Sequence, residues 1–386
     1  MRVALWGCFA IVHLALALLC LHAPGQPMGD VTQVYSFWVE RATEHGIVVG
    51  LDTPWVYPIV ALAPMLAAAA FGMANYAVTW LALIVLLDAV AFALLVRRST
   101  IAAWWWLGFL ALLGPIALAR IDSVTVPLAL AGLLVALRRP LLAGVLLAVA
   151  TWVKVWPAAL IAAGLIALRE RARMLLTVSL TTLAVALTAL LLGGGGHLLS
   201  FITEQTGRGL QVEAPVATPW LWLAALRAPG AEVYYDHDIL TYQVTGAGAA
   251  ETAAWMTPVL AVVALGIAAL GLRALRAGAE QTWLLPVLAL ALVTALIAVN
   301  KVGSPQFVTW LAVPVLLGLV LHPDAFRAPA MLVLVIAGLT HIVYPYLYGW
   351  LLALDPLMLV VLGIRNALYF VLAGWALREL WLAGRR

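Results

Sequence analysis

Four basic side chains stand at the ends of long apolar runs, where a charge is costly unless it has a use. They come from separate parts of the chain and are Arg120, Lys154, Arg208 and Lys301. Guanidinium and ammonium groups bind phosphate oxygens through charge-assisted hydrogen bonds. Taken singly, each is explained as well by snorkelling towards water or by a structural ion pair. If all four face one side, they indicate a site for an anion such as a lipid phosphate.

Asp30 is an acidic residue that could serve as a general base, which takes a proton from an attacking hydroxyl group. It is followed three residues later by Gln33, which is the spacing of a capping box. In that role the carboxylate accepts hydrogen bonds from helix amides, which lower its pKa and weaken it as a base. The spacing alone favours the cap, and both roles remain open at this point.

Other polar residues have several explanations. Asp122 lies two residues after Arg120, so a structural ion pair between them is one option. Asp88 and Arg365 both fall inside predicted helices, where a pair with each other is another option. His341 and three nearby tyrosines fit an aromatic belt at a membrane interface or a surface that stacks on a sugar. The seven histidines of the chain show no spacing typical of metal ligands.

The composition shows what kind of protein must position these residues. Of the 386 residues, 66% are hydrophobic and only 10% are charged, against about 25% charged residues in a soluble domain. This excludes a soluble enzyme, a disordered chain and a small disulfide-stabilised domain. The net charge of +4 comes with no basic cluster on a soluble face, so we expect no nucleic-acid partner.

The apolar residues form runs of a length suited to membrane helices. The first run, Val3–Leu21, lacks the small residues of a signal-peptide cleavage site, so we interpret it as a retained helix. Eleven further runs cover about 76–96, 101–118, 124–137, 141–153, 156–168, 174–192, 253–272, 281–299, 304–320, 328–345 and 357–380. The sequence therefore predicts an all-α polytopic membrane protein with about 12 transmembrane helices in a single domain, 1–386.

The positions of the basic residues predict the orientation. With both termini in the cytoplasm, 14 of the 21 Lys and Arg residues fall inside and 12 of the 17 acidic residues fall outside, as the positive-inside rule requires. The two large outer loops then cover 22–75 and 193–252. We expect a multi-pass protein of the cell membrane whose site faces outward, because the inner loops are too short for a catalytic domain.

The first outer loop is predicted to contain two interfacial helices. Apolar residues from Val31 to Ala42 recur at helical spacing on one face, which is typical of a helix lying on the membrane. A second interfacial stretch begins at Pro54 and contains Tyr57-Pro58.

These features together resemble the GT-C superfamily of membrane glycosyltransferases, and within it glycosyltransferase family 87 of the actinobacterial, polyprenyl-phosphate-sugar type. The resemblance covers nearly the whole chain and depends on the joint order of its motifs. They are Gly29-Asp30, Tyr57-Pro58, Arg120-Ile121-Asp122, Ala150 through Pro157 around Lys154, Arg208 through Glu213, Lys301 through Gln306, and His341 through Pro345.

The resemblance implies a GT-C-like bundle and an inverting transfer of a sugar. It implies a polyprenyl-phosphate donor, for which we expect mannose, and a glycolipid or polysaccharide acceptor. Asp30 would then be the catalytic base, and Arg208, Lys301, Lys154 and Arg120 would bind the donor phosphate. Residues expected to contact the sugar or acceptor are Gln211, Glu213, Asp122, Gln306, His341 and Tyr57.

One departure and two alternatives accompany this interpretation. Some GT-C families carry a second acidic residue beside the first-loop aspartate and bind a metal, but Val31 follows Asp30 here, so we expect no metal and no other cofactor. A large outer soluble domain is also absent from the sequence pattern.

A lipid-linked sugar transporter or flippase is the alternative function, favoured by inverted repeats that we do not find. A polymer ligase or acyltransferase, with His341 as the candidate residue, is a third possible function.

Overall fold

The computed structural model describes residues 2–385, and it shows a bundle of helices with a small sheet at one end. The helices are α1 (Arg2–His22), α2 (Ser36–Glu44), α3 (Leu62–Ala68), α4 (Tyr76–Val96), α5 (Thr100–Leu113), α6 (Asp122–Ala136), α7 (Pro140–Val153), α8 (Ala158–Ala167), α9 (Arg171–Leu191), α10 (Ser200–Thr206), α11 (Thr218–Ala225), α12 (Ala249–Arg276), α13 (Gln281–Ala298), α14 (Val308–Leu321), α15 (Arg327–Val343), α16 (Tyr348–Leu352) and α17 (Pro356–Ala383). The strands are β1 (Leu210–Gln211), β2 (Glu232–Asp236) and β3 (Thr241–Thr245).

Within residues 2–385, seven helical segments are long and apolar enough to cross a membrane. They are Arg2–His22, Met73–Val96, Thr100–Ala117, Arg171–Leu191, Ala249–Arg276, Gln281–Ala298 and Pro356–Ala383. Shorter apolar helices, such as α6 and α7, lie between them. The chain is therefore an α-helical membrane protein, as predicted, because a helix satisfies its own backbone hydrogen bonds in lipid. The count of about 12 spanning helices stays a prediction.

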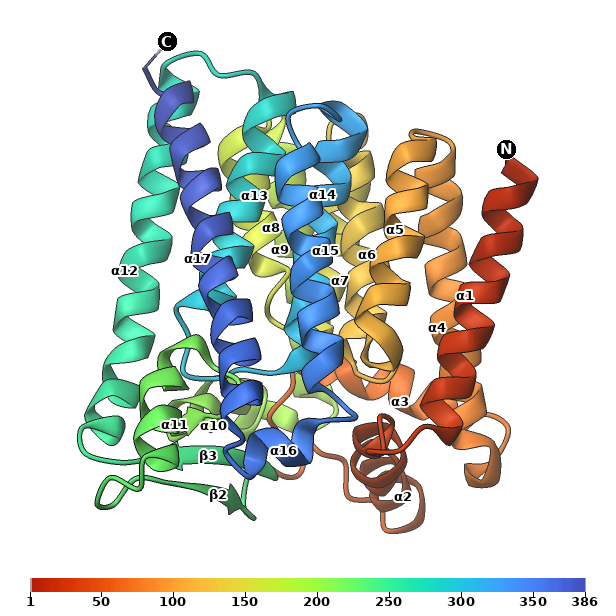
Figure 1. Cartoon of the computed structure of the whole chain (residues 1–386). Helices are drawn as coiled ribbons and strands as arrows, with labels where there is room; N and C mark the ends of the chain where they lie inside the picture. Colours follow the sequence, from red (N-terminus) through yellow and green to blue (C-terminus); the bar gives the residue numbers. More distant parts are fainter. Residues whose placement is uncertain (1, 386) are drawn as a thin grey trace.

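The helices run back and forth between two ends of the molecule. Both termini lie at one end, while α2, α3, α10, α11, α16 and the sheet lie at the opposite end (Figure 1). We call the connecting segments of that opposite end the loop layer, which consists of residues 23–75, 114–121, 154–157, 192–248, 299–307 and 344–355. The predicted placement of both termini in the cytoplasm stays a prediction.

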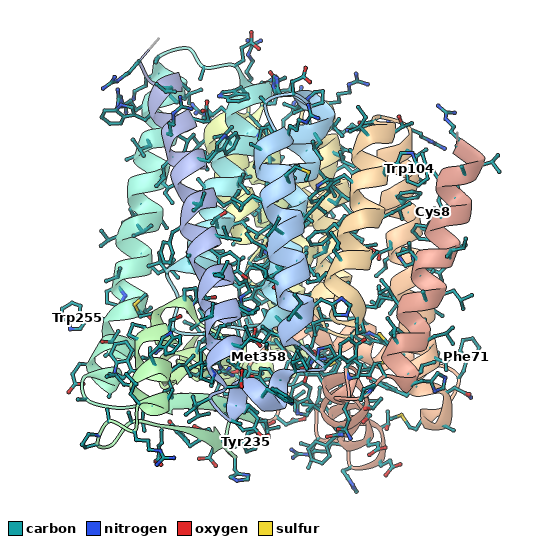
Figure 2. All side chains as sticks on the ribbon, viewed as in Figure 1. Cys8, Phe71, Trp104, Tyr235, Trp255 and Met358 are labelled. Carbon is teal, nitrogen blue, oxygen red and sulfur yellow. The ribbon has the colours of Figure 1, made fainter. Side chains whose placement is uncertain are left out.

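Exposed aromatic residues lie close to the loop layer. Phe71 and Trp255 project away from the bundle at this level (Figure 2) and are 76% and 67% exposed. Large aromatic side chains at such a level are typical of the boundary between lipid and headgroups. The loop layer thus carries exposed aromatic residues of the kind found at membrane surfaces.

The loop between α9 and α12 contains a three-stranded antiparallel sheet in the order β1-β3-β2, which the sequence analysis did not include. Tyr235 pairs with Tyr242, and Gln211 pairs with Gln243. Aromatic and β-branched residues favour such pairs. One face of the sheet, which includes Val244, packs against α16 and α17 in a small separate apolar core.

A buried hydrogen-bonded pair and a buried ion pair replace the pair considered between Asp88 and Arg365. His13 of α1 contacts Asp88 of α4 at 3.1 Å, and Arg365 of α17 contacts Glu213 of the loop layer at 2.6 Å. Each charge thus has a partner from another part of the chain, as buried charges require. Arg365 fastens α17 to the loop layer, and His13 fastens α1 to α4.

Candidate active site

Asp30 does not cap a helix, which corrects the role favoured by its spacing. It is the first residue of a short π-helix, Asp30–Tyr35, whose N-cap is Gly29 with no side-chain cap bond. The Gln33 amide donates to Gln26 Oε1 at 3.0 Å and takes no part in a capping box. Instead, Asp30 Oδ2 lies 3.1 Å from Arg120 Nε, and its side chain is 39% exposed. The carboxylate is therefore oriented by an arginine and still open to a substrate.

Arg120 is buried, and its other contacts hold it in place. Its guanidinium donates to the carbonyls of Pro27 at 2.6 Å and Ala119 at 2.7 Å, and to the Tyr344 hydroxyl at 2.6 Å. Burial lowers the pKa of Arg120, but the Asp30 carboxylate and the tyrosines outweigh this, so the pKa is raised and the charge is permanent. Arg120 is thus a fixed support for Asp30, and it does not line the pocket described below.

Lys154 lies in the segment 154–157 of the loop layer, where neighbouring side chains hold its ammonium group. Its Nζ lies 2.7 Å from Asp122 Oδ2, and Asp122 Oδ1 accepts a hydrogen bond of 2.6 Å from Trp310 Nε1. The ammonium group also lies over the rings of Phe307 at 5.2 Å and Tyr57 at 5.7 Å. Asp122 is therefore the partner of Lys154, and the option of an Asp122–Arg120 pair is wrong.

A pocket of about 480 Å³ opens beside these residues. Its polar end contains three of the four predicted cations, Lys154, Arg208 and Lys301, together with Gln306 and Tyr57. Its apolar end lies among α8, α12 and α13 and is lined by Ala158, Ala159, Ala162, Leu260, Ala264, Leu292 and Leu296. The shape and lining suit a molecule with an anionic head and a long apolar tail.

Two of the cations in the pocket repel each other. Burial lowers the pKa of Lys301, and the nearby Arg208 lowers it further. Burial also lowers the pKa of Arg208, although Tyr57, Glu204 and Asp236 partly offset this. Like charges held close together in a partly buried site favour a bound anion, which relieves their repulsion. The pair is therefore the best candidate for a phosphate site.

Gln306 and Tyr57 supply neutral polar groups to the same pocket. The Gln306 side chain is only 8% exposed, and its Oε1 has no hydrogen-bond partner among residues 2–385. Burial raises the pKa of Tyr57, and Asp30 and Asp122 raise it further, so its hydroxyl stays protonated. A buried acceptor without a partner is costly, and a substrate hydroxyl would satisfy Gln306.

Gln211 holds the Lys301 loop, Glu213 pairs with Arg365, and neither residue lines the pocket. The Gln211 backbone amide donates to the Lys301 carbonyl at 2.9 Å, and its side chain accepts from the Gly303 amide at 3.2 Å. A side chain at Gly303 would collide with the Ala214 backbone, so only glycine permits this contact. Glu213 is tied to Arg365, and the sequence analysis had no signal for that link across 152 residues.

His341 lies outside the pocket, between α5 and α15. Its Nδ1 is 3.1 Å from the Leu112 carbonyl, and its ring lies 5.4 Å from that of Tyr346. The ring occupies the space where a side chain at Gly114 would lie, and Gly114 has a φ of 77°. The structure therefore does not bring His341 to the cations. Its contacts are those of a packed side chain.

Some pocket residues were not singled out from the sequence. Asn300 and Ser304 line the pocket on either side of Lys301, and their place in the same short motif was the available signal. Trp156 stacks on Trp310 at 5.5 Å and forms an aromatic wall. Among residues 2–385, no three His, Cys, Asp or Glu side chains gather as metal ligands. The expectation of a metal-independent reaction stays a prediction.

The sequence model of glycosyltransferase family 87 matches residues 55–299, which is more than half of the chain. The matched range contains Tyr57, Arg120, Asp122, Lys154, Arg208, Gln211 and Glu213, whereas Asp30, Lys301, Gln306 and His341 lie outside it. No curated protein matches the chain. No solved structure matches it either.

Proposed function

Because the chain belongs to glycosyltransferase family 87, we propose that it moves a sugar, expected to be mannose, from a polyprenyl phosphate to a glycolipid or polysaccharide acceptor. The observation that carries this proposal is the pocket with Lys154, Arg208 and Lys301 at one end and an alanine- and leucine-lined trough at the other. A lipid monophosphate fits both ends. Asp30 would supply the base; it does not line the pocket, but its charge acts on Tyr57, which does.

The donor would enter from the membrane through the trough. Its prenyl chain would lie along α8, α12 and α13, where the lining is apolar, so the chain would exchange the apolar interior of the membrane for another apolar environment. Its phosphate would lie between Arg208 and Lys301, with Lys154 beside it. The phosphate charge would relieve the repulsion between the first two cations.

In the reaction, an Asp30 carboxylate oxygen removes the proton of an acceptor hydroxyl group. The hydroxyl oxygen attacks the anomeric carbon while the bond from that carbon to the phosphate oxygen breaks, so the configuration inverts. Polyprenyl phosphate leaves with the bonding electron pair, and the cations stabilise the charge that develops on it. Arg120 keeps the Asp30 carboxylate in position throughout.

The remaining predicted residues divide into two groups. Gln306 and Tyr57 line the pocket, and we propose that they contact hydroxyl groups of the donor sugar. Asp122 orients Lys154, Gln211 positions the Lys301 loop, and Glu213 pairs with Arg365 of α17. We propose no contact between His341 and the substrates. The reaction is proposed to need no metal or other cofactor, and the loop layer is proposed to face the outside of the cell.

The test uses the full-length protein in lipid nanodiscs with synthetic polyprenyl-phosphate [¹⁴C]mannose and a soluble mannoside acceptor. Wild-type protein should form a product of inverted configuration, in the presence of a chelator as well. Asp30→Asn keeps the size of the side chain but removes the base, and it should lower kcat by about 10³-fold. Its thermal unfolding temperature should stay close to that of the wild type, which separates lost chemistry from lost folding.

Unchanged turnover by Asp30→Asn would refute the proposed role of this residue. The same preparation distinguishes the transporter alternative. Movement of a fluorescent lipid-linked sugar across vesicles, with no transfer to any acceptor, would support a flippase and overturn the proposal.

A further inference from the structure

Four tyrosine rings form a continuous strip on the loop layer, which we call the tyrosine strip: Tyr235, Tyr242, Tyr348 and Tyr344. The ring centroids are 4.9 Å apart between Tyr235 and Tyr242, 6.2 Å between Tyr242 and Tyr348, and 5.4 Å between Tyr348 and Tyr344. The strip starts at the exposed hairpin of β2 and β3, where Tyr235 lies at the edge of the molecule (Figure 2). It ends among the residues that follow α15.

The tyrosine strip leads to the proposed base. The Tyr344 hydroxyl accepts a hydrogen bond of 2.6 Å from Arg120, and Arg120 holds the half-buried Asp30 carboxylate. Burial raises the pKa of Tyr235 and of Tyr344, and the Asp30 charge contributes to both shifts. The exposed end and the inner end of the strip thus both lie within the electrostatic reach of Asp30.

The exposed end of the tyrosine strip is acidic, unlike the pocket, whereas its inner end contacts the guanidinium of Arg120. The hairpin segment 232–245 contains three acidic residues and no Lys or Arg, and the segment 344–355 contains one acidic residue and no Lys or Arg. The pocket contains three cations. A phosphorylated ligand would be repelled from the strip and attracted to the pocket.

We propose that the tyrosine strip is the acceptor subsite and that it binds a neutral carbohydrate, not a phosphorylated one, by stacking sugar rings on the tyrosine rings. This inference rests on the proposed function, in which Asp30 activates an acceptor hydroxyl. Tyrosine combines a flat apolar face with a hydroxyl group, which matches the C–H faces and hydroxyl edges of a sugar. A glycan lying along the strip reaches Asp30 with its terminal residue.

The sheet offers a matched control for this proposal. Tyr235 and Tyr234 are neighbours with similar exposure, 37% and 39%. Successive residues of a strand point to opposite faces, so only Tyr235 shares a face with Tyr242, its partner across the strands. Tyr235 lies on the face of the sheet that includes Val244, and Tyr234 lies on the opposite face with Gln243.

The experiment measures binding of α-mannotriose and of mannotriose 6-phosphate by saturation-transfer difference NMR, without donor. The full-length protein is kept in lipid nanodiscs, because sugar-based detergents would compete. We expect the wild type to bind mannotriose and to bind its phosphate more weakly. Tyr235→Ala should weaken mannotriose binding by about 10-fold, Tyr235→Phe should restore it, and Tyr234→Ala should leave it unchanged.

Equal weakening by Tyr235→Ala and Tyr234→Ala, or tighter binding of the phosphorylated glycan, would overturn the proposal. The test separates this inference from the proposed function through Asp30→Asn. That variant should bind mannotriose like the wild type although it transfers no sugar. If the wild type transfers sugar normally but binds mannotriose away from the strip, the subsite alone is refuted. If it binds mannotriose on the strip but transfers no sugar, the proposed function is refuted.

Discussion

The donor pocket and the tyrosine strip lie in the same loop layer, yet they differ in almost every physical property. The pocket is basic at one end and apolar at the other, and it is recessed among three helices. The strip is aromatic, acidic in its surroundings and placed on an exposed hairpin. Asp30 pairs with Arg120, which contacts the strip through Tyr344, and it raises the pKa of Tyr57 in the pocket. Under the proposed function, this difference would let charge direct a lipid phosphate to the pocket and a neutral sugar chain to the strip.

The two regions also differ in how they are stabilised. The cations of the pocket are held at a cost, because burial and mutual repulsion lower the pKa of Lys301 and burial lowers that of Arg208. The rings of the tyrosine strip pack on one another and carry no such cost. A bound phosphate would therefore offset the repulsion between these cations and stabilise the protein.

The largest expected effect comes from breaking the ion pair between Arg365 and Glu213, which supports both regions. Arg365→Met leaves the Glu213 carboxylate buried without a partner, and this should cost about 3–5 kcal/mol of stability. Glu213 follows β1, which pairs with β3 of the sheet and also holds the Lys301 loop. We therefore expect a clear fall of the thermal unfolding temperature and weaker binding of both substrates.

The double variant Arg365→Met with Glu213→Gln provides the control. It removes the unpaired charge and should recover most of the lost unfolding temperature. A loss of donor binding alone would show that the sheet does not depend on this pair.

The next effect concerns the donor side only. Lys301→Ala removes one of the two cations that we assign to the phosphate, and kcat/KM for the donor should fall by about 100-fold. Mannotriose binding to the tyrosine strip should not change. Initial rates at varied donor concentration and the NMR titration measure the two quantities separately, and Lys301→Arg, which keeps the charge, is the control. An equal loss on both sides would contradict the division between the regions.

A smaller effect should follow from filling the apolar trough. Ala162 is an exposed residue of α8 that lines the pocket. Ala162→Trp should raise KM by about 10-fold for a long-chain donor, because the indole ring would fill space that the prenyl chain needs, and overpacking of this kind costs about 1–3 kcal/mol. A donor with a prenyl chain too short to reach Ala162 should be unaffected. Equal effects on both donors would place the lipid elsewhere.

The smallest predicted effect is a shift of the pH profile. The pKa of Lys301 lies below its ordinary value of 10.5, because of burial and then Arg208. Lys301 is charged below its pKa, so donor kcat/KM should be high at neutral pH and fall as the pH rises through this lowered pKa. Lys301→Arg should extend the plateau to higher pH, since guanidinium stays protonated. Mannotriose binding should show no such alkaline fall, and a fall in both would contradict the comparison.

Much of the candidate site could be predicted because charges are rare in this chain. Lys154, Arg208 and Lys301 were found as isolated cations at the ends of apolar runs, and the structure places them in one pocket. Their partners could not be predicted. Arg120 and Asp122 are neighbours in sequence but have different partners: Arg120 lies in the bend before α6 and pairs with Asp30, whereas Asp122 begins α6 and pairs with Lys154.

The sequence analysis also left out elements that depend on distant contacts. The strands are only 2 to 5 residues long, which is too short for a periodic signal to stand out. The tyrosine strip joins the β2–β3 hairpin to the residues after α15, which lie about a hundred positions later in the chain. Whether Asp30 caps a helix depended on the fold as well, because only the structure shows that its carboxylate contacts Arg120 and no helix amide.

The sequence by itself determined that this is an α-helical membrane protein, that its useful charges are few, and which of them stand at helix ends. These conclusions follow from local composition and from the cost of charge in lipid. Only the tertiary structure decided which charges pair, which remain available to a ligand, and which aromatic rings join into one surface. Pairing and exposure depend on the packing of segments far apart in the chain, and that information is not local to any motif.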